Sequence, residues 1–270
     1  MGMNSHILGR QTQVNSKLDE HLEELRLVGY TVLHNVFEKA EVDMMSQKID
    51  LIYNKQIEEL EGELALCDIN DEFNVRMPMY YDSYFVDLIK NDHIINLLEG
   101  FLGQYFILYS QNCNINMPGD DFAHSRWHTD VPYQEFNATR PLGLTSIVCL
   151  DDFNAENGGT LIIPCSHRME CLPSDKYVEK FAVPIEASAG SVIAFDTMLY
   201  HMSGINHSNQ GRKGIVQIYS IGNLRQQYDT ATFFKGKYKD DKLLEMLLGY
   251  GVYAPSSVVE WRKSRISRIK

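Results

Sequence analysis

A histidine and an aspartate stand two residues apart near the middle of the chain, in the stretch SRWHTDVPYQEF, residues 125 to 136. On an extended strand, alternate residues point to the same face, so His128 and Asp130 would present an imidazole and a carboxylate side by side. Such a pair could be a catalytic base with its orienting acid, two of the three ligands of a metal ion, or part of an ordinary surface strand. The pattern is too short to decide between these alternatives by itself.

The second half of the chain holds two candidates for a third ligand beside this pair. His201 directly follows the apolar run SVIAFDTMLY, where a strand can hold its ring toward the interior. His207 lies in GINHSNQG, whose Gly, Asn and Ser residues are typical of a surface loop. We therefore expect His201 rather than His207 to join His128 and Asp130. Ser203 would share the face of His201 if the chain stays extended there.

These residue types would suit one particular metal chemistry. Two histidines and one carboxylate hold one side of an Fe(II) ion and leave the other positions for a chelating co-substrate and O2. Arg212 lies eleven residues after His201. Its planar guanidinium has the geometry to pair with the remote carboxylate of such a co-substrate.

Length, charge and cysteine content narrow the class of protein. The 270 residues are 44% hydrophobic, which suffices for the core of one large domain. The formal net charge of −11 argues against nucleic acid or an anionic membrane as the main partner, and no apolar run approaches the length of a membrane span. The five cysteines are odd in number and lack C-x-x-C spacing, which favours free thiols in a reducing cytosol. We therefore expect a cytoplasmic protein.

The elements that must position these residues change in type along the chain. Residues 29 to 37, GYTVLHNVF, predict a strand, and apolar residues at helical spacing follow over residues 38 to 57. A second helical stretch covers residues 84 to 103, and DDKLLEMLLG, residues 240 to 249, predicts a late helix. Between them, NGG at residues 157 to 159 predicts a tight hairpin. Short β-rich runs separated by Gly, Asn and Pro occur at residues 104–115, 142–150, 160–164, 180–186, 191–196 and 214–222.

The spacing of these short strands favours a sandwich or jelly roll over alternating βαβ units. We predict an α+β fold, a double-stranded β-helix (a cupin-like jelly roll) flanked by α-helices, in a single domain over residues 1 to 270. Its parts would be an N-terminal helical flank at about 38–103, a jelly-roll core at about 104–222 and a C-terminal helical tail at about 239–270. A jelly roll brings strands that are distant in sequence side by side, so a late strand can complete a site that an early one begins.

Three motifs occur in a fixed order along the chain: WHTD, ENGGTLIIPCSH and HMSGINHSNQGR. Together with the N-terminal stretch GYTVLHNVFEKAEVDMM, they resemble the successive motifs of the phytanoyl-CoA dioxygenase family of Fe(II)/2-oxoglutarate-dependent oxygenases. The interval from histidine to arginine matches as well, and the resemblance covers most of residues 29 to 222.

The resemblance implies both a metal set and a co-substrate site. The metal ligands would be His128, Asp130 and His201, which together would bind Fe(II). Arg212 would bind the distal carboxylate of the co-substrate 2-oxoglutarate, and Ser203 would add a hydrogen bond to it. The implied partners are 2-oxoglutarate, O2 and a small-molecule substrate, with no nucleic acid and no membrane.

Three further positions compare with the family pattern in different ways. Gln111 matches a glutamine that the family often has, and the resemblance implies that it faces the co-substrate. Met117 stands where a lysine is usual, and Ile147 stands where a tryptophan is frequent. One wall of the pocket should therefore differ from that of typical relatives.

By resemblance, the protein is a non-haem Fe(II)/2-oxoglutarate-dependent dioxygenase, an enzyme that releases succinate and CO2 as it oxidises its substrate. Asp130 would keep a carboxylate on the metal and leave no vacancy for chloride, which favours hydroxylation, or a related desaturation or cyclisation, over halogenation. No basic cluster for the phosphates of an acyl-CoA is evident around the motifs, so we expect a small metabolite or biosynthetic intermediate to be hydroxylated. Neither its identity nor the oligomeric state follows from the sequence.

Two other classes of protein remain open. The chain could be a jelly-roll binding protein with a vestigial iron site, or a cupin-type metalloenzyme that needs no 2-oxoglutarate. Retention of both histidines, the aspartate and the arginine counts against the first class. The spacing of Arg212 and Ser203 disfavours the second.

Several other polar residues have a plainer interpretation. Asp151 and Asp152 could be acid–base carboxylates, but their position before ENGG favours a solvated turn. His167, in PCSHR, suits a structural turn better than a metal site. His124 would be a solvent-side or substrate-side residue, and Tyr133 would either reach the substrate or pack at the rim.

Overall fold

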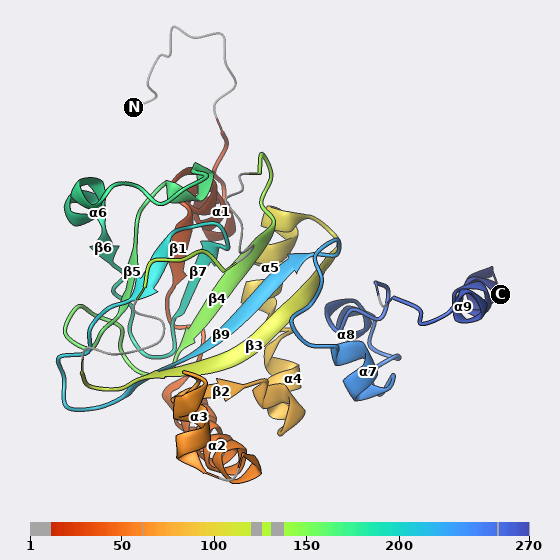
Figure 1. Cartoon of the computed structure of the whole chain (residues 1–270). Helices are drawn as coiled ribbons and strands as arrows, with labels where there is room; N and C mark the ends of the chain where they lie inside the picture. The colour runs from red at the N-terminus through yellow and green to blue at the C-terminus, as the bar shows by residue number, and fades with distance from the viewer. Residues whose placement is uncertain (1–11, 61, 120–125, 131–137, 253, 270) are drawn as a thin grey trace, which may run out of the picture.

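Two antiparallel β-sheets form the centre of the molecule in a computed structural model (Figure 1). The structure describes residues 12–60, 62–119, 126–130, 138–252 and 254–269. The larger sheet has the strand order β1 (Tyr30–Leu33), β7 (Val192–Asp196), β4 (Gly143–Cys149), β9 (Arg212–Ile221), β3 (Phe106–Asn116) and β2 (Asn74–Arg76). The smaller sheet has the order β6 (Val183–Pro184), β5 (Thr160–Ile162) and β8 (His201–Ser203).

The chain passes back and forth between the two sheets. Strand β4 lies in the larger sheet, β5 and β6 lie in the smaller, β7 returns to the larger, β8 to the smaller, and β9 to the larger. This alternation is the winding of a double-stranded β-helix, so the predicted α+β jelly-roll class is confirmed. The winding also places His201 opposite His128 in a β-bridge, although the two residues are far apart in the chain.

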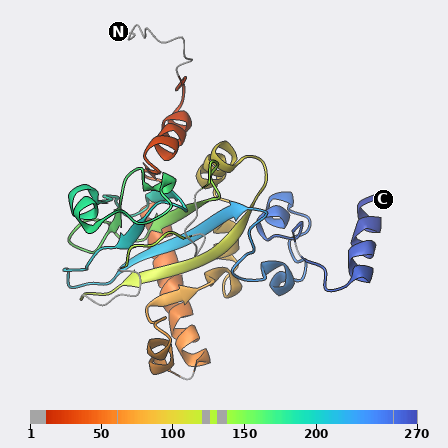
Figure 2. The same ribbon diagram turned by 45° about the horizontal axis from the view of Figure 1, so that its top comes forward.

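Helices cover the outer face of the larger sheet (Figures 1 and 2). They are α1 (Lys17–Leu27), α2 (Lys39–Glu59), α4 (Tyr84–Leu88), α5 (Asp92–Leu102) and α8 (Lys242–Leu247). The other helical segments are α3 (Glu63–Asp68), η1 (Pro78–Tyr80), η2 (Ser166–Arg168), α6 (Asp175–Phe181), α7 (Thr230–Phe234) and α9 (Val258–Ile269). In both views α9 stands apart from the sheets. Within the described ranges, every helix is too short or too polar to cross a lipid bilayer.

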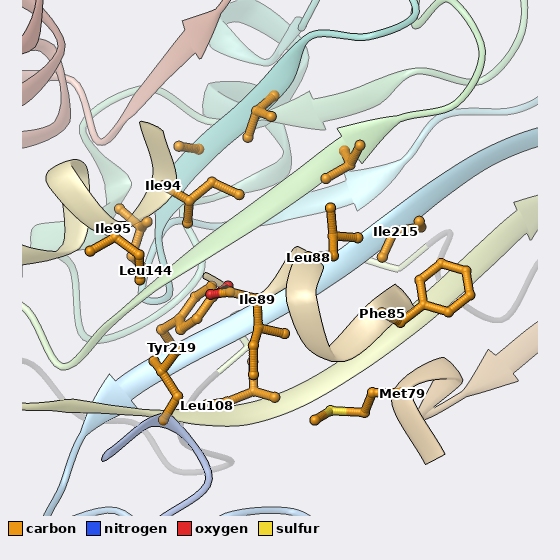
Figure 3. Close-up of a cluster of buried hydrophobic side chains, with 14 of the residues drawn as sticks. Met79, Phe85, Leu88, Ile89, Ile94, Ile95, Leu108, Leu144, Ile215 and Tyr219 are labelled. Atoms are coloured by element: carbon orange, nitrogen blue, oxygen red, sulfur yellow. Dashed lines mark hydrogen bonds between the residues drawn. The ribbon is translucent and has the colours of Figure 1, made fainter. Parts of the chain in front are cut away.

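The alternation of side chains along each strand gives the larger sheet two apolar faces. On the outer face, strand and helix side chains form one core, shown in Figure 3, which includes Phe85, Ile89, Ile94, Leu108, Leu144, Ile215 and Tyr219. The inner face, toward the smaller sheet, carries a smaller cluster that includes Ile147, Phe153, Ile162, Ile193 and Phe195. The helix-covered face therefore holds most of the apolar core, and the inner face has room for polar groups.

The predicted helix over residues 84 to 103 is two helices. The first, α4, ends at Leu88, and α5 begins at Asp92 after the N-cap residue Asn91. The Asn91 side-chain oxygen accepts hydrogen bonds from the backbone N–H groups of His93, at 3.1 Å, and Ile94, at 3.4 Å. An asparagine in this role starts a new helix, because its side chain satisfies N–H groups that lack a partner in the first turn.

The NGG sequence does not form the predicted hairpin. Residues 157–159 carry the chain out of the larger sheet, after β4, and into β5 of the smaller sheet. The Asn154 side chain accepts hydrogen bonds from the backbone N–H groups of Glu156 and Asn157, both at 3.0 Å. Gly158 then turns the chain with a φ of +69°, which glycine adopts without strain. The turn signal was correct, but the two strands that it joins do not pair.

Most of the other predicted strands are present, and one is shorter than predicted. The runs at 104–115, 142–150, 160–164, 191–196 and 214–222 correspond to β3, β4, β5, β7 and β9. The run at 180–186 was wrong in part, because α6 continues to Phe181 and only Val183–Pro184 form a strand. Helix α1 precedes the predicted helical flank. All five cysteines are free thiols, as expected.

We predict that Ile94→Ala destabilises the fold by about 2–5 kcal/mol, because it leaves a cavity between α5 and the larger sheet. Ile94 is fully buried, whereas Leu51 on α2 is 70% exposed. The matched change Leu51→Ala should alter the free energy of unfolding by less than about 0.5 kcal/mol. Urea denaturation of both variants measures the difference, and equal effects would contradict this assignment of the core.

Candidate functional site

The structure brings three side chains from distant segments to one point on the inner face. One ligand atom from each of His128, Asp130 and His201 can be chosen so that all three lie within 4.8 Å of one another. The backbone N–H groups of His128 and His201 each donate to the carbonyl oxygen of the other, both at 3.0 Å. The Asp130 N–H donates to the Thr197 carbonyl at 2.9 Å. Main-chain hydrogen bonds therefore set the spacing of the three side chains.

Each imidazole is oriented by a carbonyl oxygen two residues earlier in the chain. His128 Nδ1 lies 2.7 Å from the Arg126 oxygen, and His201 Nδ1 lies 2.9 Å from the Leu199 oxygen. A carbonyl only accepts, so each Nδ1 carries the proton and donates it. In the neutral ring, Nε2 then presents a lone pair, which is the arrangement that metal-binding histidines use.

Charge is balanced within the three side chains. Burial opposes ionisation of Asp130, but the neighbouring histidines and a hydrogen bond from the Thr145 hydroxyl outweigh it and lower its pKa to about 2. Burial lowers the pKa of His201, yet the Asp130 carboxylate, 3.6 Å from Nε2, raises it overall. Burial and the charge of His201 lower the pKa of His128. A bound cation would supply the positive charge that His201 otherwise provides, with both rings neutral.

A cavity of about 380 Å³ opens beside these side chains. Its apolar wall comes from the middle strands of the larger sheet and consists of Ile147, Phe195, Val216 and Ile218. A polar wall comes from β2, at the edge of the larger sheet, and from the neighbouring β3. Ile147, which replaces a tryptophan frequent in the family pattern, therefore does form part of the wall, whereas Met117 is 38% exposed and is not among the lining residues.

Arg212 begins β9 and is buried, with its guanidinium 4.0 Å from the centre of the Phe153 ring. Its Nη2 donates to the Gly158 carbonyl at 2.9 Å, while its Nε–H has no hydrogen-bond partner within the described ranges. No described carboxylate forms an ion pair with it. Burial lowers its pKa to about 10, so it remains a cation at neutral pH. A buried cation without a counter-ion is costly, and this one fits an anionic ligand.

Ser203 lines the cavity, opposite Thr160 in the pairing of β8 with β5. The Asn116 side chain donates to the carbonyl oxygens of Gly158 and Gly204, both at 3.0 Å. It thereby ties the loop that Arg212 contacts to the residue that follows Ser203. Arg212 itself is not one of the residues that line the cavity.

Gln111 does not meet the expectation that it faces the co-substrate. Its side-chain oxygen accepts from the Met79 N–H at 3.0 Å, and its amide nitrogen donates to the Phe85 carbonyl at 2.9 Å. Both partners lie on the helix-covered face of the larger sheet, while its neighbours Ser110 and Asn112 line the cavity. Successive residues of a strand point to opposite faces, so a match in sequence did not give Gln111 the required direction.

The remaining polar residues take structural positions. Asp151 accepts a hydrogen bond from the Lys213 N–H and Asp152 from the Ala189 N–H, both at 2.8 Å, as expected of turn residues. His167 is buried in η2 and does not line the cavity. The expected positions of His124 and Tyr133 lie outside the described residues.

One supporting residue escaped the sequence analysis. Thr145 donates its hydroxyl proton to Asp130 from the adjacent wall of the cavity. Its signal was a polar residue within the apolar run LGLTSIVCL, fully buried in the structure.

Residues 25–214 match the phytanoyl-CoA dioxygenase (PhyH) family. The chain belongs to this family. The match includes His128, Asp130, His201 and Arg212, so all of the residues discussed for metal and co-substrate lie within the family's common region.

Relatives of this PhyH-family protein are about a quarter identical to it over the aligned residues. Rv1501 of Mycobacterium tuberculosis is 26% identical over 218 residues, which cover 80% of either chain. The dioxygenase af480 of Aspergillus fumigatus is 28% identical over 209 residues, 74% of this chain and 64% of that protein. The ectoine dioxygenase of Bordetella bronchiseptica is 23% identical over 221 residues, 71% of each chain.

Solved structures show the same fold at lower identity. AviO1 from Streptomyces viridochromogenes Tue57 superposes with a TM-score of 0.56 at 21% identity, covering 77% of this chain and 96% of that one. SnoK, a non-haem α-ketoglutarate-dependent carbocyclase from nogalamycin biosynthesis, superposes with a TM-score of 0.58 at 20% identity, covering 77% and 85%. These likenesses support the jelly-roll architecture.

We predict that His201→Ala abolishes Fe(II) binding, whereas His207→Ala retains it. His201 lies in the cluster, and His207 is exposed in the loop that precedes β9. Metal analysis of both purified variants, reloaded with Fe(II) without oxygen, measures the difference. The reverse pattern would show that the third ligand has been misassigned.

We also predict that Gln111→Leu weakens the fold and leaves 2-oxoglutarate affinity unchanged. The change strips partners from the buried Met79 N–H and Phe85 carbonyl, at a cost of about 2–4 kcal/mol in unfolding free energy. The exposed Gln210 provides the control change Gln210→Leu. Urea denaturation measures the stability of both variants, and titration with 2-oxoglutarate measures their affinity. A large loss of affinity with unchanged stability would show that Gln111 contacts the co-substrate after all.

Proposed function

We propose that this PhyH-family protein is a non-haem Fe(II)/2-oxoglutarate-dependent dioxygenase that hydroxylates a small metabolite or biosynthetic intermediate. The observation that carries the proposal is the cluster of His128, Asp130 and His201, whose ligand atoms lie within 4.8 Å on the wall of a cavity. Two histidines and a carboxylate, with a cavity beside them, are the donor set of non-haem Fe(II) oxygenases. The name of one relative, ectoine dioxygenase, and that of a structural neighbour, the α-ketoglutarate-dependent carbocyclase SnoK, support the class of oxygenase and do not choose between hydroxylation and cyclisation.

In this proposal His128, Asp130 and His201 hold Fe(II) through two Nε2 atoms and one carboxylate oxygen. When bound together, iron, 2-oxoglutarate and O2 supply the oxidant for a C–H bond of the substrate, with succinate and CO2 as co-products. The protein's part is to orient the ligands. The carbonyl oxygens of Arg126 and Leu199 fix the rings, and Thr145 holds the second oxygen of Asp130.

Arg212 and Ser203 are proposed to hold the remote carboxylate of 2-oxoglutarate. A carboxylate would pair with the buried Arg212 guanidinium, whose Nε–H has no partner within the described part of the chain. The ring of Phe153 covers one face of that guanidinium and keeps water from it. Ser203, on the cavity wall, would add its hydroxyl as a further donor.

The apolar wall and the aspartate favour oxidation of the substrate without halogenation. Ile147, Val216 and Ile218 present only hydrocarbon to the cavity, so they would exclude water beside the metal without offering a competing ligand. Asp130 occupies a metal position that a halide would need. On these grounds we propose hydroxylation, or a related desaturation or cyclisation, over halogenation. We propose a cytoplasmic location from the five free thiols.

The two alternatives make different predictions for the same assay. A binding protein with a vestigial site would form no succinate under any condition. A cupin-type enzyme would turn over its substrate without 2-oxoglutarate. Succinate formation and consumption of the substrate by the Fe(II)-loaded protein, both measured with and without 2-oxoglutarate across a panel of small metabolites, separate the three classes. Succinate that appears only with 2-oxoglutarate and Fe(II) is the result expected here.

We predict that Arg212→Leu raises the 2-oxoglutarate concentration needed for half-maximal turnover by about ten-fold or more, because a charge-assisted contact is lost. Iron content should stay unchanged, since Arg212 is not part of the metal cluster. A 2-oxoglutarate titration of succinate formation measures this shift. An unchanged requirement would show that another residue holds the carboxylate.

A further inference from the structure

The polar wall of the cavity belongs to the last two strands at one edge of the larger sheet. Strand β2 pairs with β3 so that Arg76 stands opposite Asn112. Val75 and Cys113, the next pair, are buried in the outer core beneath the helices. Because side chains alternate along both strands, Arg76 and Asn112 share the inner face, and both line the cavity.

Ser110 adds a hydroxyl group to this wall. The pairing of β3 with β9 shifts between Leu108 and Ser110, so Tyr109 is an extra residue and both it and Ser110 reach the cavity. Ser110 is only 1% exposed, and its Oγ has no hydrogen-bond partner within the described ranges. A buried hydroxyl without a partner costs roughly 1–3 kcal/mol. A ligand in the cavity would supply that partner.

The Asn112 amide is oriented by the backbone. Its Oδ1 accepts a hydrogen bond from the Met77 N–H at 3.4 Å. The main acceptor of this N–H is the Gln111 carbonyl, at 2.9 Å, and Asn112 Oδ1 is its second acceptor. The amide nitrogen is thereby directed away from Met77, and Asn112 meets the cavity as a donor.

Arg76 is held in place from two sides. Asp71 accepts from Nε at 3.0 and 3.1 Å and also from Nη2, which fixes the plane of the guanidinium. The Gln56 side chain pairs with the Arg76 backbone, accepting from its N–H at 2.9 Å and donating to its carbonyl at 2.6 Å. These contacts hold the guanidinium in a fixed orientation where Arg76 lines the cavity.

The charge of the cavity differs from that of the whole chain. The protein has 36 acidic and 25 basic residues. Among the described residues that line the cavity, two are arginines, Arg76 and Arg126, and Asp130 is the only carboxylate. Asp130 belongs to the metal cluster, and Asp71 balances the charge of Arg76 from outside the lining. The remainder of the wall therefore has no carboxylate of its own and is rich in hydrogen-bond donors. Such a wall suits a group that is negative and only accepts.

This donor wall lies apart from the proposed metal and co-substrate positions. Ser110, Ile218 and Thr145 stand in one row across β3, β9 and β4, so Ser110 is two strand spacings, about 10 Å, from the threonine that holds Asp130. Asn112 stands opposite Val216, and Arg212 lies four residues further along β9, a separation of about 13 Å. One small molecule on the donor wall could therefore reach the metal without entering the Arg212 site.

We propose that Arg76, Asn112 and Ser110 form a subsite for the carboxylate of the substrate. The inference rests on the proposed dioxygenase function and specifies its substrate class as small organic acids. The carboxylate binds at the edge of the sheet, and the carbon to be oxidised lies several bonds away, beside His128 and His201. The apolar wall between them covers the hydrocarbon part.

The test compares an acid with its neutral counterpart. The probes are 4,4,4-trifluorobutyrate and 4,4,4-trifluorobutanamide, titrated by ¹⁹F NMR into protein that holds Fe(II) and saturating 2-oxoglutarate without oxygen. The acid should bind at least about five-fold more tightly than the amide, because its contacts are charge-assisted. Fe(II) content and 2-oxoglutarate affinity, measured first on the same sample, test the proposed function separately.

Two variants locate the acid. Asn112→Asp keeps an oxygen for the Met77 N–H but places a negative charge on the wall, so it should weaken binding of the acid at least about ten-fold. The same substitution at the exposed Asn223, Asn223→Asp, should change it by less than about two-fold. Ser110→Ala removes only the hydroxyl and should weaken the acid by about five-fold, with the amide less affected.

Three results would overturn the subsite while the dioxygenase proposal stands. They are equal affinity for acid and amide, no detectable binding of the acid, and equal effects of Asn112→Asp and Asn223→Asp. Displacement of the acid by further 2-oxoglutarate would also overturn it, because the donor wall would then be a co-substrate site. Protein that binds neither Fe(II) nor 2-oxoglutarate would refute the proposed function, and this substrate assignment with it.

Discussion

The reciprocal backbone hydrogen bonds between His128 and His201 are the contact on which the candidate site depends. They join a segment that follows β3 to the start of β8, and so connect parts of the chain that no local interaction could bring together. Their geometry leaves the two ring centres 4.3 Å apart. A further hydrogen bond, from the Asp130 N–H to the Thr197 carbonyl oxygen, holds the same segment in place. Because these bonds are made by main-chain atoms, the frame can survive replacement of the side chains that it positions.

The larger sheet separates stability from chemistry by the alternation of its side chains. Tyr219, Ile215 and Leu144 face the helices and form the outer core. Their neighbours along the same strands, among them Thr145 and Ile218, face the cavity. A substitution on one face therefore acts mainly on the free energy of unfolding, and one on the other acts mainly on binding.

Two buried charges of opposite sign lie on the inner face. The Asp130 carboxylate is stabilised by His201 and Thr145, whereas the Arg212 guanidinium has only Gly158 and the Phe153 ring beside it in the described part of the chain. Burying a charge without a full set of partners costs stability. Ligands that pair with both charges would increase the free energy of unfolding, because they bind the folded state and not the unfolded state. The fold and its proposed ligands are thus energetically linked.

The amino-acid sequence by itself determined most of the strands and the three residues that meet in the candidate metal cluster. The distinction between His201 and His207 rested on local chemistry, since an apolar run before one and a Gly-, Asn- and Ser-rich segment around the other mark a strand and a loop. The ordered motifs likewise indicated the PhyH family, because they lie in the segments that surround the cluster. In such cases the signal is carried by residues close in sequence.

Only the tertiary structure decided which face of a strand each side chain occupies. The second half of strand β3, NCNIN, alternates polar and apolar residues. It is preceded by two more polar residues, Ser110 and Gln111, and the strand is covered on both sides, so polarity alone does not say which face these two occupy. A shift of one residue in the strand register moves every side chain to the opposite face. In the observed register, Gln111 hydrogen-bonds to the backbone of Met79 and Phe85 on the helix-covered face, while Ser110 and Asn112 line the cavity. Two other features also depend on residues that are distant in the sequence. They are the passage of the chain from one sheet to the other at NGG and the pairing of Arg76 with Asn112. They depend on contacts between segments whose separation along the chain gives no local signal.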